Sequence, residues 1–353
     1  MSRPARWWLG ARGPRYVQDA QEAGVPTRRA ALCAAGGFWL AAILCGVPAA
    51  QAADAWPTHA IKLVVPFAAG GGVDAVARAL AAQLSDELHQ SVVVENRVGA
   101  GGLIGTDYVA KSDPDGYTLL MGTQTTLAVA PLLSKGATLD PLKAFAGTSL
   151  VADSPMLLVA NPGFAAKDMK QLIELAKQKP GYVNYGSGGV GTTPHMAGEL
   201  LALSTGIKMT HVAYKGEQPA LTDVVGNQIP LMFSNLVVAL PLVQSGRLRA
   251  LAISTAQRSP AAPAIPTVAE SGVPGFDAAT WFGVVAPKAT PRAVVDKLSD
   301  AIHQAVNSPR LRQILQSQGL NVRTSTPAAF DAYMASEFDK WRGVIQQARI
   351  STQ

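Results

Sequence analysis

The stretch of sequence that decides the fold is 64–74, which reads VVPFAAGGGVD. The apolar run 61–65 predicts a buried β-strand, and Asp74 is expected to cap a helix that begins there. Glycines leave the connection nearly free of side chains. Such a loop can present backbone N–H groups and a helix N-terminus to a small anion, or it can only let the chain turn tightly beside the helix. The residues alone leave both interpretations open.

The same order of strand, glycine-rich loop and helix recurs along the chain. A second glycine loop, 99–102, follows an expected strand at 92–94 and precedes a helix from Ile104. A third, 186–191, follows an expected strand at 183–185 and leads into a helix opened by Thr193 and Pro194. This alternation is typical of α/β proteins with mostly parallel sheets. Because it appears in both halves, we expect two similar lobes that face each other.

The remaining pattern supplies further elements of both kinds. In the first helix, apolar residues recur every four positions, which predicts one buried face made of Val76, Leu80, Leu84 and Leu88. More strands are expected at 117–121, 207–212, 229–233, 248–254 and 281–286. More helices are expected at 171–179 and after the Thr-Pro pairs at 290–291 and 326–327.

The first 52 residues have the order of an export signal. Arg28 and Arg29 precede an apolar stretch, 30–47, and small residues at 50–52 form an A-x-A cleavage site. Glycines interrupt the stretch, which favours a cleaved signal peptide over a transmembrane anchor and predicts a periplasmic location. Both cysteines, Cys33 and Cys45, lie in this segment, so the rest of the chain has no disulfide and no thiol ligand.

Charge and motif content narrow the function classes. The chain has 30 basic and 24 acidic residues, but six arginines and two acids lie in the first 52 residues, which leaves 24 against 22 and a net charge of +2. No nucleic-acid partner is therefore expected. The histidines lack metal-ligand spacing, and neither G-x-S-x-G nor H-E-x-x-H occurs. We assign no metal site and no catalytic residue.

Two segments match a dinucleotide-binding fingerprint. The segment 186–191 fits G-x-G-x-x-G, but the next strand ends at 211–214 with no acid there to hold a ribose. The segment 70–75 fits the variant pattern with Glu95 at a suitable distance, yet four residues separate the strand from the glycines, where the fingerprint requires a tighter turn. Nicotinamide cofactors also belong to the cytoplasm. No cofactor is expected, and a Rossmann-type enzyme is kept as the alternative.

Some side chains near the loops have both a binding and a structural interpretation. His195 begins a helix beside the third loop, where it can touch a ligand or brace the loop from its own helix. Among the aromatic residues at predicted strand ends, Phe67 is the best candidate for a cavity wall because Pro66 fixes the chain beside it. Tyr214 and Phe233 have the same two interpretations, and Trp281 is assigned to the core.

A series of motifs extends over nearly the whole mature chain. They read IxxVVPF at 61–67, GGxxD at 70–74, VENRxGAGGxIG at 94–105, PDGYTLL at 114–120, YKG at 214–216, PTVAESG at 266–272 and WxGxxAP at 281–287. Together they resemble the tripartite tricarboxylate transporter substrate-binding proteins, the TctC or Bug (Bordetella uptake) family. The number and order of the motifs make this resemblance far more specific than any one glycine loop.

The resemblance implies a monomeric two-lobed periplasmic binding protein, or Venus flytrap. Its lobes would close on a small organic acid or related solute and present it to the permease subunits of a tripartite tricarboxylate-type transporter. Lobe 1 would comprise 53–154 and 277–353, and lobe 2 would comprise 155–276. In that family the carboxylate lies on backbone amides of the first loop and its counterpart in the other lobe. Carried over, the expected ligand-binding residues are Phe67, Ala68, Ala69, Gly70, Gly71, Asp74, Thr123, Thr125, Ser187, Gly188, Thr192, Thr193, His195, Tyr214 and Ser234.

One position departs from the family pattern. Many relatives have an acidic residue after the strand that ends at Phe233, where this chain has Ser234 and Asn235. If Ser234 faces the cleft, ligands with an amine lose a counter-charge, and plain or hydroxylated acids are favoured. Two other classes stay open: a secreted enzyme whose catalytic pair assembles in space, and a periplasmic sensor whose closed form is read by a receptor.

Overall fold

The computed structural model describes residues 56–134, 139–214 and 216–351, which belong to one compact unit, Ala52–Gln353. The expected signal segment, with Cys33 and Cys45, lies outside the described residues. Among the helices of the described part, none has the length and apolar character needed to cross a membrane.

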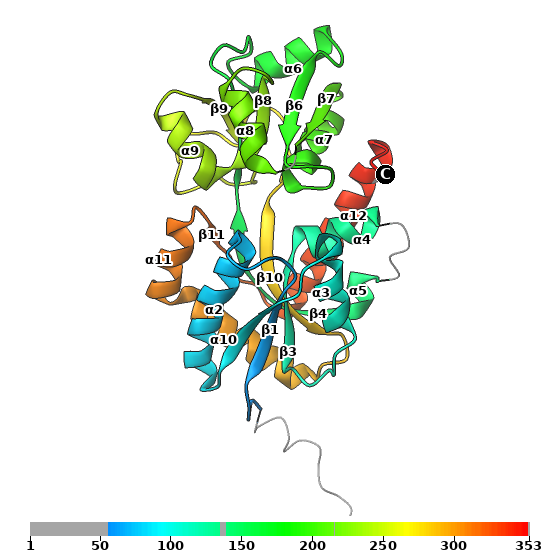
Figure 1. Cartoon of the computed structure of the whole chain (residues 1–353), viewed down its shortest axis with the longest axis vertical. Helices are drawn as coiled ribbons and strands as arrows, with labels where there is room; N and C mark the ends of the chain where they lie inside the picture. The colour runs from blue at the N-terminus through cyan, green and yellow to red at the C-terminus, as the bar shows by residue number, and fades with distance from the viewer. Residues whose placement is uncertain (1–55, 135–138, 215, 352–353) are drawn as a thin grey trace, which may run out of the picture. The chain divides into compact units, whose positions relative to one another are not determined.

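The first sheet has six strands in the order β11-β4-β10-β3-β1-β2 (Figure 1). β1 pairs in parallel with β2 and β3, whereas β10 runs antiparallel to β3 and β4, and β11 runs antiparallel to β4. The strands are β1 (Ile61–Val65), β2 (Val92–Asn96), β3 (Thr118–Thr123), β4 (Phe145–Ser154), β10 (Thr280–Pro287) and β11 (Asn321–Val322).

The second sheet has five strands in the order β7-β6-β8-β5-β9. β6 pairs in parallel with β7 and β8, and β5 runs antiparallel to β8 and β9. The strands are β5 (Met156–Ala160), β6 (Val183–Ser187), β7 (Met209–Ala213), β8 (Leu231–Asn235) and β9 (Arg249–Ile253).

Both sheets are mixed, which corrects the expectation of mostly parallel sheets. The reason lies in how the chain crosses between them. β4 ends at Ser154 in the first sheet and β5 starts at Met156 in the second, and β10 brings the chain back (Figure 1). A strand that arrives from the other sheet runs against the strands of the local β-α-β units, so β5 and β10 are antiparallel to their neighbours β8 and β3.

The chain thus changes sheet between 154 and 156 and again between 253 and 280. The helix α12 (Pro327–Gln347) does not follow this division. Its Phe330 is buried in a cluster with residues of the first sheet, whereas Trp341 is buried in a cluster with residues of the second. The lobe limits given above, 53–154 with 277–353 against 155–276, therefore stay a prediction.

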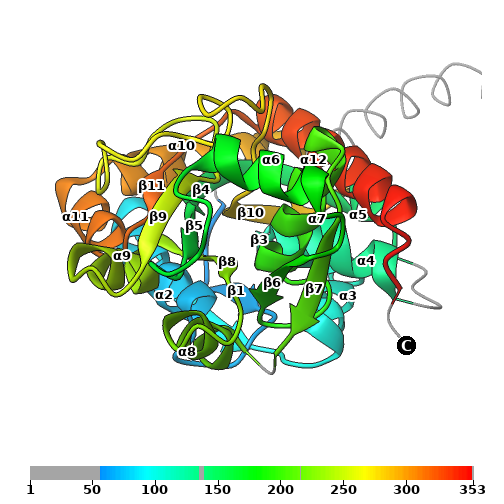
Figure 2. The same cartoon turned by 90° about the horizontal axis from the view of Figure 1, so that it is seen from above.

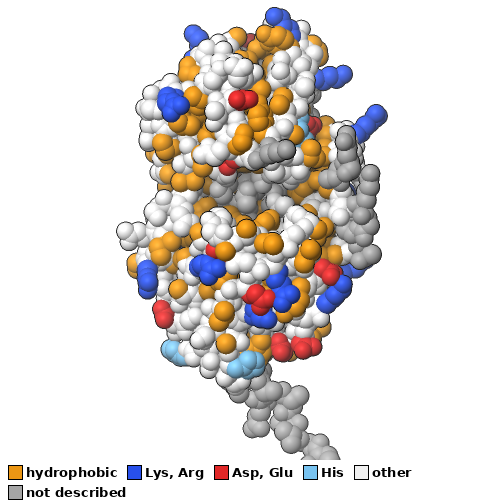
Figure 3. Space-filling model, viewed as in Figure 1, with side chains coloured by type: hydrophobic (Ala, Val, Ile, Leu, Met, Phe, Trp, Pro, Cys, Tyr) orange, Lys and Arg blue, Asp and Glu red, His pale blue; other side chains and the backbone are white. Residues whose placement is uncertain are grey.

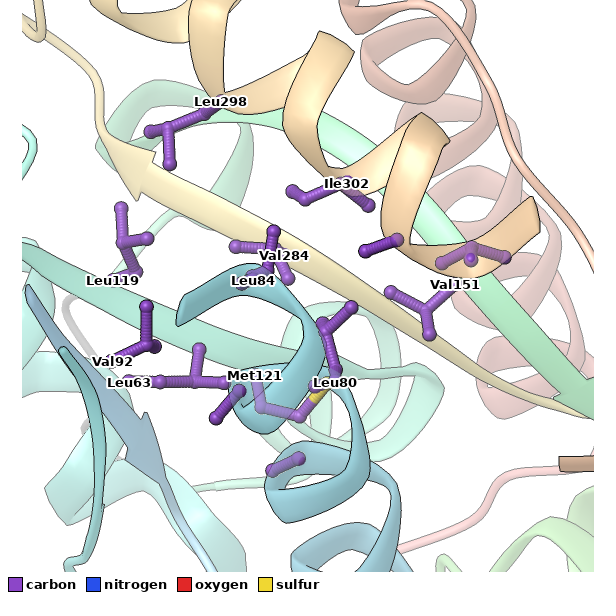
Figure 4. Close-up of a cluster of buried hydrophobic side chains, with 14 of the residues drawn as sticks. Leu63, Leu80, Leu84, Val92, Leu119, Met121, Val151, Val284, Leu298 and Ile302 are labelled. Atoms are coloured by element: carbon purple, nitrogen blue, oxygen red, sulfur yellow. The ribbon is translucent and has the colours of Figure 1, made fainter. Parts of the chain in front are cut away.

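Helices cover both faces of the first sheet. On one face lie α2 (Gly72–Leu88), α10 (Arg292–Asn307) and α11 (Pro309–Ser317); on the other lie α3 (Leu103–Ala110), α5 (Pro141–Ala144) and the first part of α12. Successive residues of a strand point to opposite faces, so Leu63 and Val64 of β1 enter different clusters. Figure 4 shows the first cluster, with side chains from α2, α10 and the strands meeting: Leu63, Leu80, Leu84, Val92, Leu119, Met121, Val151, Val284, Leu298 and Ile302.

The second sheet is covered in the same way. α6 (Met169–Gln178), α7 (Thr193–Thr205) and the end of α12 pack on one face, and α8 (Glu217–Val225) and α9 (Leu236–Gln244) on the other (Figure 2). β5 alternates between the two clusters, with Leu158 in one and Leu157 in the other. Because strands of this kind are buried on both faces, their sequences read as continuous apolar runs.

The start of α2 corrects one detail. The predicted buried stripe is confirmed, since Val76, Leu80, Leu84 and Leu88 are all buried. However, the helix begins at Gly72 and its N-cap is Gly71, so Asp74 is the third helical residue and not the cap. From there its carboxylate reaches back and accepts a hydrogen bond from the N–H of Gly70. An acid at this position closes the first turn from inside the helix.

Candidate ligand-binding site

A cavity of about 680 Å³ lies between loops that belong to the two sheets. In the space-filling view the surface narrows between the α2–β1 region below and the α8–α9 region above, and apolar side chains border this recess (Figure 3). The lining residues are Phe67, Ala100, Gly101, Leu103, Thr125, Val129, Ala130, Leu133, Ser134, Gly188, Val190, Gly191, Thr192, Thr193, Pro194, Gly216, Glu217, Asn235 and Thr280.

The topology explains why these loops meet. Apart from Thr280, which opens β10, the lining comes from the last residue of β8 and from the segments that follow β1, β2 and β3 in the first sheet and β6 and β7 in the second. All six strands end at the cavity. In open α/β sheets, ligands bind beyond the carboxyl ends of the parallel strands, where helix N-termini also point. Here two such edges form a single cavity.

The second glycine loop contributes to the cavity through its backbone path. Gly99, Ala100, Gly101 and Gly102 have φ values of 129°, 49°, 65° and 95°, a region that L side chains rarely adopt. A Cβ on Gly102 would lie 2.6 Å from Cγ2 of Thr126. The loop therefore lies directly on the segment after β3 and brings Ala100 and Gly101 to the cavity surface.

The first glycine loop contributes less than expected. Phe67 is half-buried and lines the cavity, but Ala68, Ala69, Gly70 and Gly71 are exposed and do not line it. The physical reason is the second loop, which approaches Phe67: a Cβ on Gly102 would lie 3.4 Å from the ring of Phe67. The structure thus assigns the cavity lining to Phe67 and to the second loop, and not to residues 68–71.

Asp74 fixes the shape of the first loop from beneath. Its buried carboxylate accepts hydrogen bonds from Gly70 N at 2.9 Å, Arg78 Nε at 2.8 Å and Asn96 Nδ2 at 2.9 Å. These donors, Arg78 first, lower the pKa of Asp74 to about 2. Asn96 also donates to the carbonyl oxygen of Phe67 at 3.0 Å. Asp74 therefore positions the loop and does not face the cavity.

The third glycine loop lines the cavity together with the N-terminus of α7. Thr192 is the N-cap of α7, and its hydroxyl donates to Gly189 O at 2.7 Å, so it does not cap the helix with its side chain. Pro194, the second helical residue, has no N–H to leave unpaired. The positive end of the α7 dipole is thus directed at the cavity with no side-chain cap across it.

Thr193 connects the two halves of the cavity. Its hydroxyl donates to Gln124 Oε1 at 2.9 Å and accepts from the hydroxyl of Thr280 at 2.9 Å. Gln124 directly follows β3 of the first sheet, and Thr280 opens β10. Thr193 therefore ties the start of α7 to the other sheet.

Behind the third loop lie two stacked histidines, of which His195 is buried and His211 is half-buried. The N–H of Gly191 donates to His195 Nδ1 at 3.0 Å, and the ring of His195 stacks on that of His211 at 3.9 Å. His211 Nε2 lies 2.6 Å from Ser187 Oγ. Burial lowers the pKa of His195 to about 3, helped by His211, and lowers that of His211 to about 4. His195 and Ser187 brace the loop and do not line the cavity.

The two threonines near the end of β3 that were expected to bind ligand have different positions in the structure. Thr125 lines the cavity, whereas Thr123 is buried and its hydroxyl lies 3.3 Å from that of Thr126. The segment that follows is a π-helix (Thr125–Val129), continued by α4 (Ala130–Leu133), and it supplies Val129 and Leu133 to the cavity wall.

Tyr214 and Ser234, also expected to bind ligand, do not line the cavity. Tyr214 donates its hydroxyl to Asp223 Oδ2 at 2.7 Å, and burial, with this carboxylate, raises the pKa of Tyr214 to about 12. Ser234 is buried and donates to Glu217 Oε1 at 2.7 Å. The acidic residue beside the cavity is therefore Glu217, which no motif in the sequence marks.

In the dinucleotide-binding alternative, Glu95 would have to bind a ribose, but its carboxylate is already engaged in ion pairs. The carboxylate of Glu95 is 2.9 Å from Lys62 Nζ and 2.5 Å from Arg97 Nε, and these cations lower its pKa, Lys62 most. A ribose hydroxyl would have to compete with two ion pairs for it. In the described part, moreover, no group of three or more His, Cys, Asp or Glu side chains could hold a metal ion.

Comparison with known proteins accounts for this architecture. The sequence profile of the tripartite tricarboxylate transporter family receptor matches residues 76–350. The chain belongs to this family. It is 39% identical to the protein BugT of Bordetella pertussis (strain Tohama I) over 303 residues, which cover 86% of this chain and 93% of BugT.

Solved structures of similar proteins agree with the assignment to this receptor family. An R. palustris protein described with adipate is 36% identical, with a TM-score of 0.69, over 84% of this chain and 99% of its own. MatC from Rhodopseudomonas palustris, described with bound malate, is 32% identical, with a TM-score of 0.66, over 82% of this chain and 100% of its own. The chain is thus a solute-binding receptor with the two-lobed α/β fold of periplasmic binding proteins, and not an enzyme.

The sequence did not predict several of the residues that line the cavity of this TctC-family receptor. Ala100 and Gly101 lie in a glycine loop that was recognised, but nothing in the sequence shows that this loop, and not the first, reaches the cavity. Glu217 carried a weak signal as an acid directly after a glycine that opens a helix. Val129, Asn235 and Thr280 gave none, since their exposure to the cavity depends on how the two sheets meet.

Proposed function

We propose that this receptor captures a small organic acid in the cavity between its two sheets and delivers it to the permease subunits of a tripartite tricarboxylate-type transporter. The observation that carries the proposal is the meeting of the α7 N-terminus with the second glycine loop at one cavity. Backbone N–H donors and a helix dipole stabilise a carboxylate without a lysine or arginine. The adipate and malate described with two relatives are ligands of this chemical kind.

The proposed ligand contacts are the expected residues that line the cavity: Phe67, Thr125, Gly188, Thr192 and Thr193. Phe67 would pack against the carbon skeleton, and the threonine hydroxyls would supply donors beside the backbone. Other expected residues are buried and do not line the cavity, and their proposed role is to hold the loops in position: Asp74, Thr123, Ser187, His195 and Ser234. The protein would act as a monomer in the periplasm after removal of residues 1–52.

Ligand capture would also shift the receptor toward a closed form. The cavity is bounded by loops of both sheets, so a bound acid contacts both at once. The shift can be no larger than the difference in the ligand's affinity for the two forms. The permease would then distinguish the closed form from the open one.

Thermal unfolding of the protein without residues 1–52, measured against small acids, their amides and NAD, tests the binding step. A ligand present at a hundredfold excess over its dissociation constant adds about 2.7 kcal/mol of stability, which shifts the midpoint visibly. Stabilisation by acids but not by their amides, with the acid recovered unchanged, is the expected result. Stabilisation by NAD alone would contradict the proposal. Loss of uptake of the same acid on deletion of the gene tests the delivery step.

A further inference from the structure

One charged side chain stands out in the cavity. Among the described lining residues, Glu217 alone carries a formal charge. It is the first residue of α8 and directly follows Gly216, in the connection after β7. In the second sheet β6 lies between β7 and β8, and Glu217 bonds to Ser234 and Asn235 at the end of β8. Its side chain therefore spans the carboxyl end of β6, the central one of these three strands.

The protein holds this carboxylate in a fixed orientation. Oε1 accepts hydrogen bonds from Ser234 Oγ and Asn235 N, both at 2.7 Å, and Oε2 accepts one from Asn235 Nδ2 at 2.6 Å. A carboxylate has about four acceptor positions, so Oε2 retains room for one more donor. The backbone of Glu217 is in contact with the third glycine loop, because a Cβ on Gly188 would lie 3.2 Å from its N atom.

A fixed negative charge restricts what can lie against it. A second carboxylate of the ligand would be repelled by Glu217, whereas a hydroxyl or ammonium group can donate to Oε2 and gain a charge-assisted hydrogen bond. We propose that Glu217 determines specificity: it selects acids that carry one carboxylate and, at the far end, a hydroxyl or ammonium donor. This inference rests on the proposed function, because it assumes that a carboxylate occupies the cavity.

For ligands with an amine, the proposal is opposite to the expectation drawn from Ser234 and Asn235, whereas hydroxylated acids stay favoured. That expectation held that an amine would lose its counter-charge because these positions are neutral. In the structure both residues donate to Glu217, so a counter-charge is present in the cavity but comes from the neighbouring α8. Ser234 and Asn235 are thus the hydrogen-bond donors of the carboxylate of Glu217.

The test compares matched ligands that differ only in the far group. For each chain length from three to six carbons, the set comprises the ω-hydroxy acid, the ω-amino acid and the dicarboxylic acid; at four carbons these are 4-hydroxybutyrate, 4-aminobutyrate and succinate. Affinities are measured by calorimetry for the wild type, Glu217→Gln, Ser234→Ala and Glu174→Gln. Glu174→Gln changes the net charge equally at an exposed position of α6.

We expect the wild type to prefer a hydroxy or amino acid over the dicarboxylic acid of equal length. Glu217→Gln should lower the affinity for the preferred ligand by about tenfold or more and raise the affinity for the dicarboxylic acid. The order of the two affinities would then be reversed. Whichever of the two, the hydroxy acid or the amino acid, loses more affinity in Glu217→Gln identifies the donor as a hydroxyl or an ammonium group. Ser234→Ala keeps the charge and removes one hydrogen bond, so it should retain the wild-type order, as should Glu174→Gln.

Two kinds of failure are distinguishable. If the wild type binds carboxylates, but Glu217→Gln leaves the order unchanged or weakens all ligands alike, Glu217 does not select the far group and the proposed function stands. A reversal in Ser234→Ala would also overturn the inference, because loop packing and not charge would then set the order. If the wild type binds no acid of any set, both this inference and the proposed function fail.

Discussion

The hydroxyl of Thr193, at the start of α7, donates to Oε1 of Gln124, which follows β3 of the other sheet. Both side chains are buried, and the bond joins segments that are 69 residues apart. Because Thr193 also lines the cavity, this bond between the two sheets lies at the wall of the proposed ligand site. Ligand affinity and the contact between the sheets should therefore depend on the same hydroxyl.

Replacing Thr193 tests this dependence. Thr193→Val keeps the shape but leaves Gln124 Oε1 buried without its donor, which costs about 1–3 kcal/mol. We expect a lower midpoint of thermal unfolding together with weaker binding of any acid that stabilises the wild type. Thr205→Val is the matched control, since the Thr205 hydroxyl bonds only within α7, to Leu201 O. Equal losses in the two variants would argue against a special role for the Thr193–Gln124 bond.

Asp74→Asn should destabilise the fold. The substitution removes a charge that three donors hold in a buried site, and we expect a loss of about 1–2 kcal/mol in urea unfolding at pH 7. Since the folded pKa of about 2 lies below the ordinary value of 3.8, the contribution is present above pH 3.8 and is lost as the pH falls toward 2. The difference in unfolding free energy between the wild type and Asp74→Asn should therefore shrink as the pH falls from 3.8 toward 2. Asp86→Asn, at an exposed position of α2, should have little effect.

The stacked histidines, His195 and His211, predict a loss of stability in mild acid. The pKa values of His195 and His211 are lowered to about 3 and about 4, so below pH 6.5 the unfolded chain takes up protons that the folded chain does not. Stability should fall between pH 6.5 and 5 by up to about 1.4 kcal/mol per pH unit for each histidine. His195→Gln should reduce this slope, whereas His303→Gln, at an exposed site of α10, should leave it unchanged. A flat profile in the wild type would contradict the assignment.

Gly188→Ala should weaken ligand binding. The added Cβ would lie 3.2 Å from backbone atoms of both Gly216 and Glu217, so the third loop and α8 would have to separate by a few tenths of an ångström. Overpacking of this kind costs about 1 kcal/mol or more. Gly343→Ala is the control: a Cβ there meets nothing within 4 Å, and alanine should stabilise α12 by about 0.5–1 kcal/mol. Unchanged affinity in Gly188→Ala would show that the loop position is not critical.

Local patterns predicted a large part of this fold. The stripe of α2 and the strand β1 follow from residue periodicity within one element, and both formed as expected. The strands β4 and β5 were not predicted, although they join the two sheets. They are buried along almost their whole length, with only Pro155 between them, so the segment 145–160 shows no polar alternation and no long loop to mark two strands.

The candidate site was predictable only in outline. The sequence located the glycine loops and the start of α7, because both have compositional signals. It did not show which of two adjacent loops would reach the cavity, since that depends on Gly102 and Phe67 approaching each other from separate β-α units. Nor did it place Glu217, because the partners that hold its carboxylate, Ser234 and Asn235, follow 17 and 18 residues later.

The shared helix α12 limits how this receptor can be taken apart. Phe330 and Met334 fill the core beside the first sheet, while Trp341, Val344 and Ile345 fill the core beside the second. A gene fragment that encodes 155–276 alone would lack these last three side chains and would present an apolar groove to solvent. Chimeras that exchange one half between relatives must therefore carry the matching end of α12 with it.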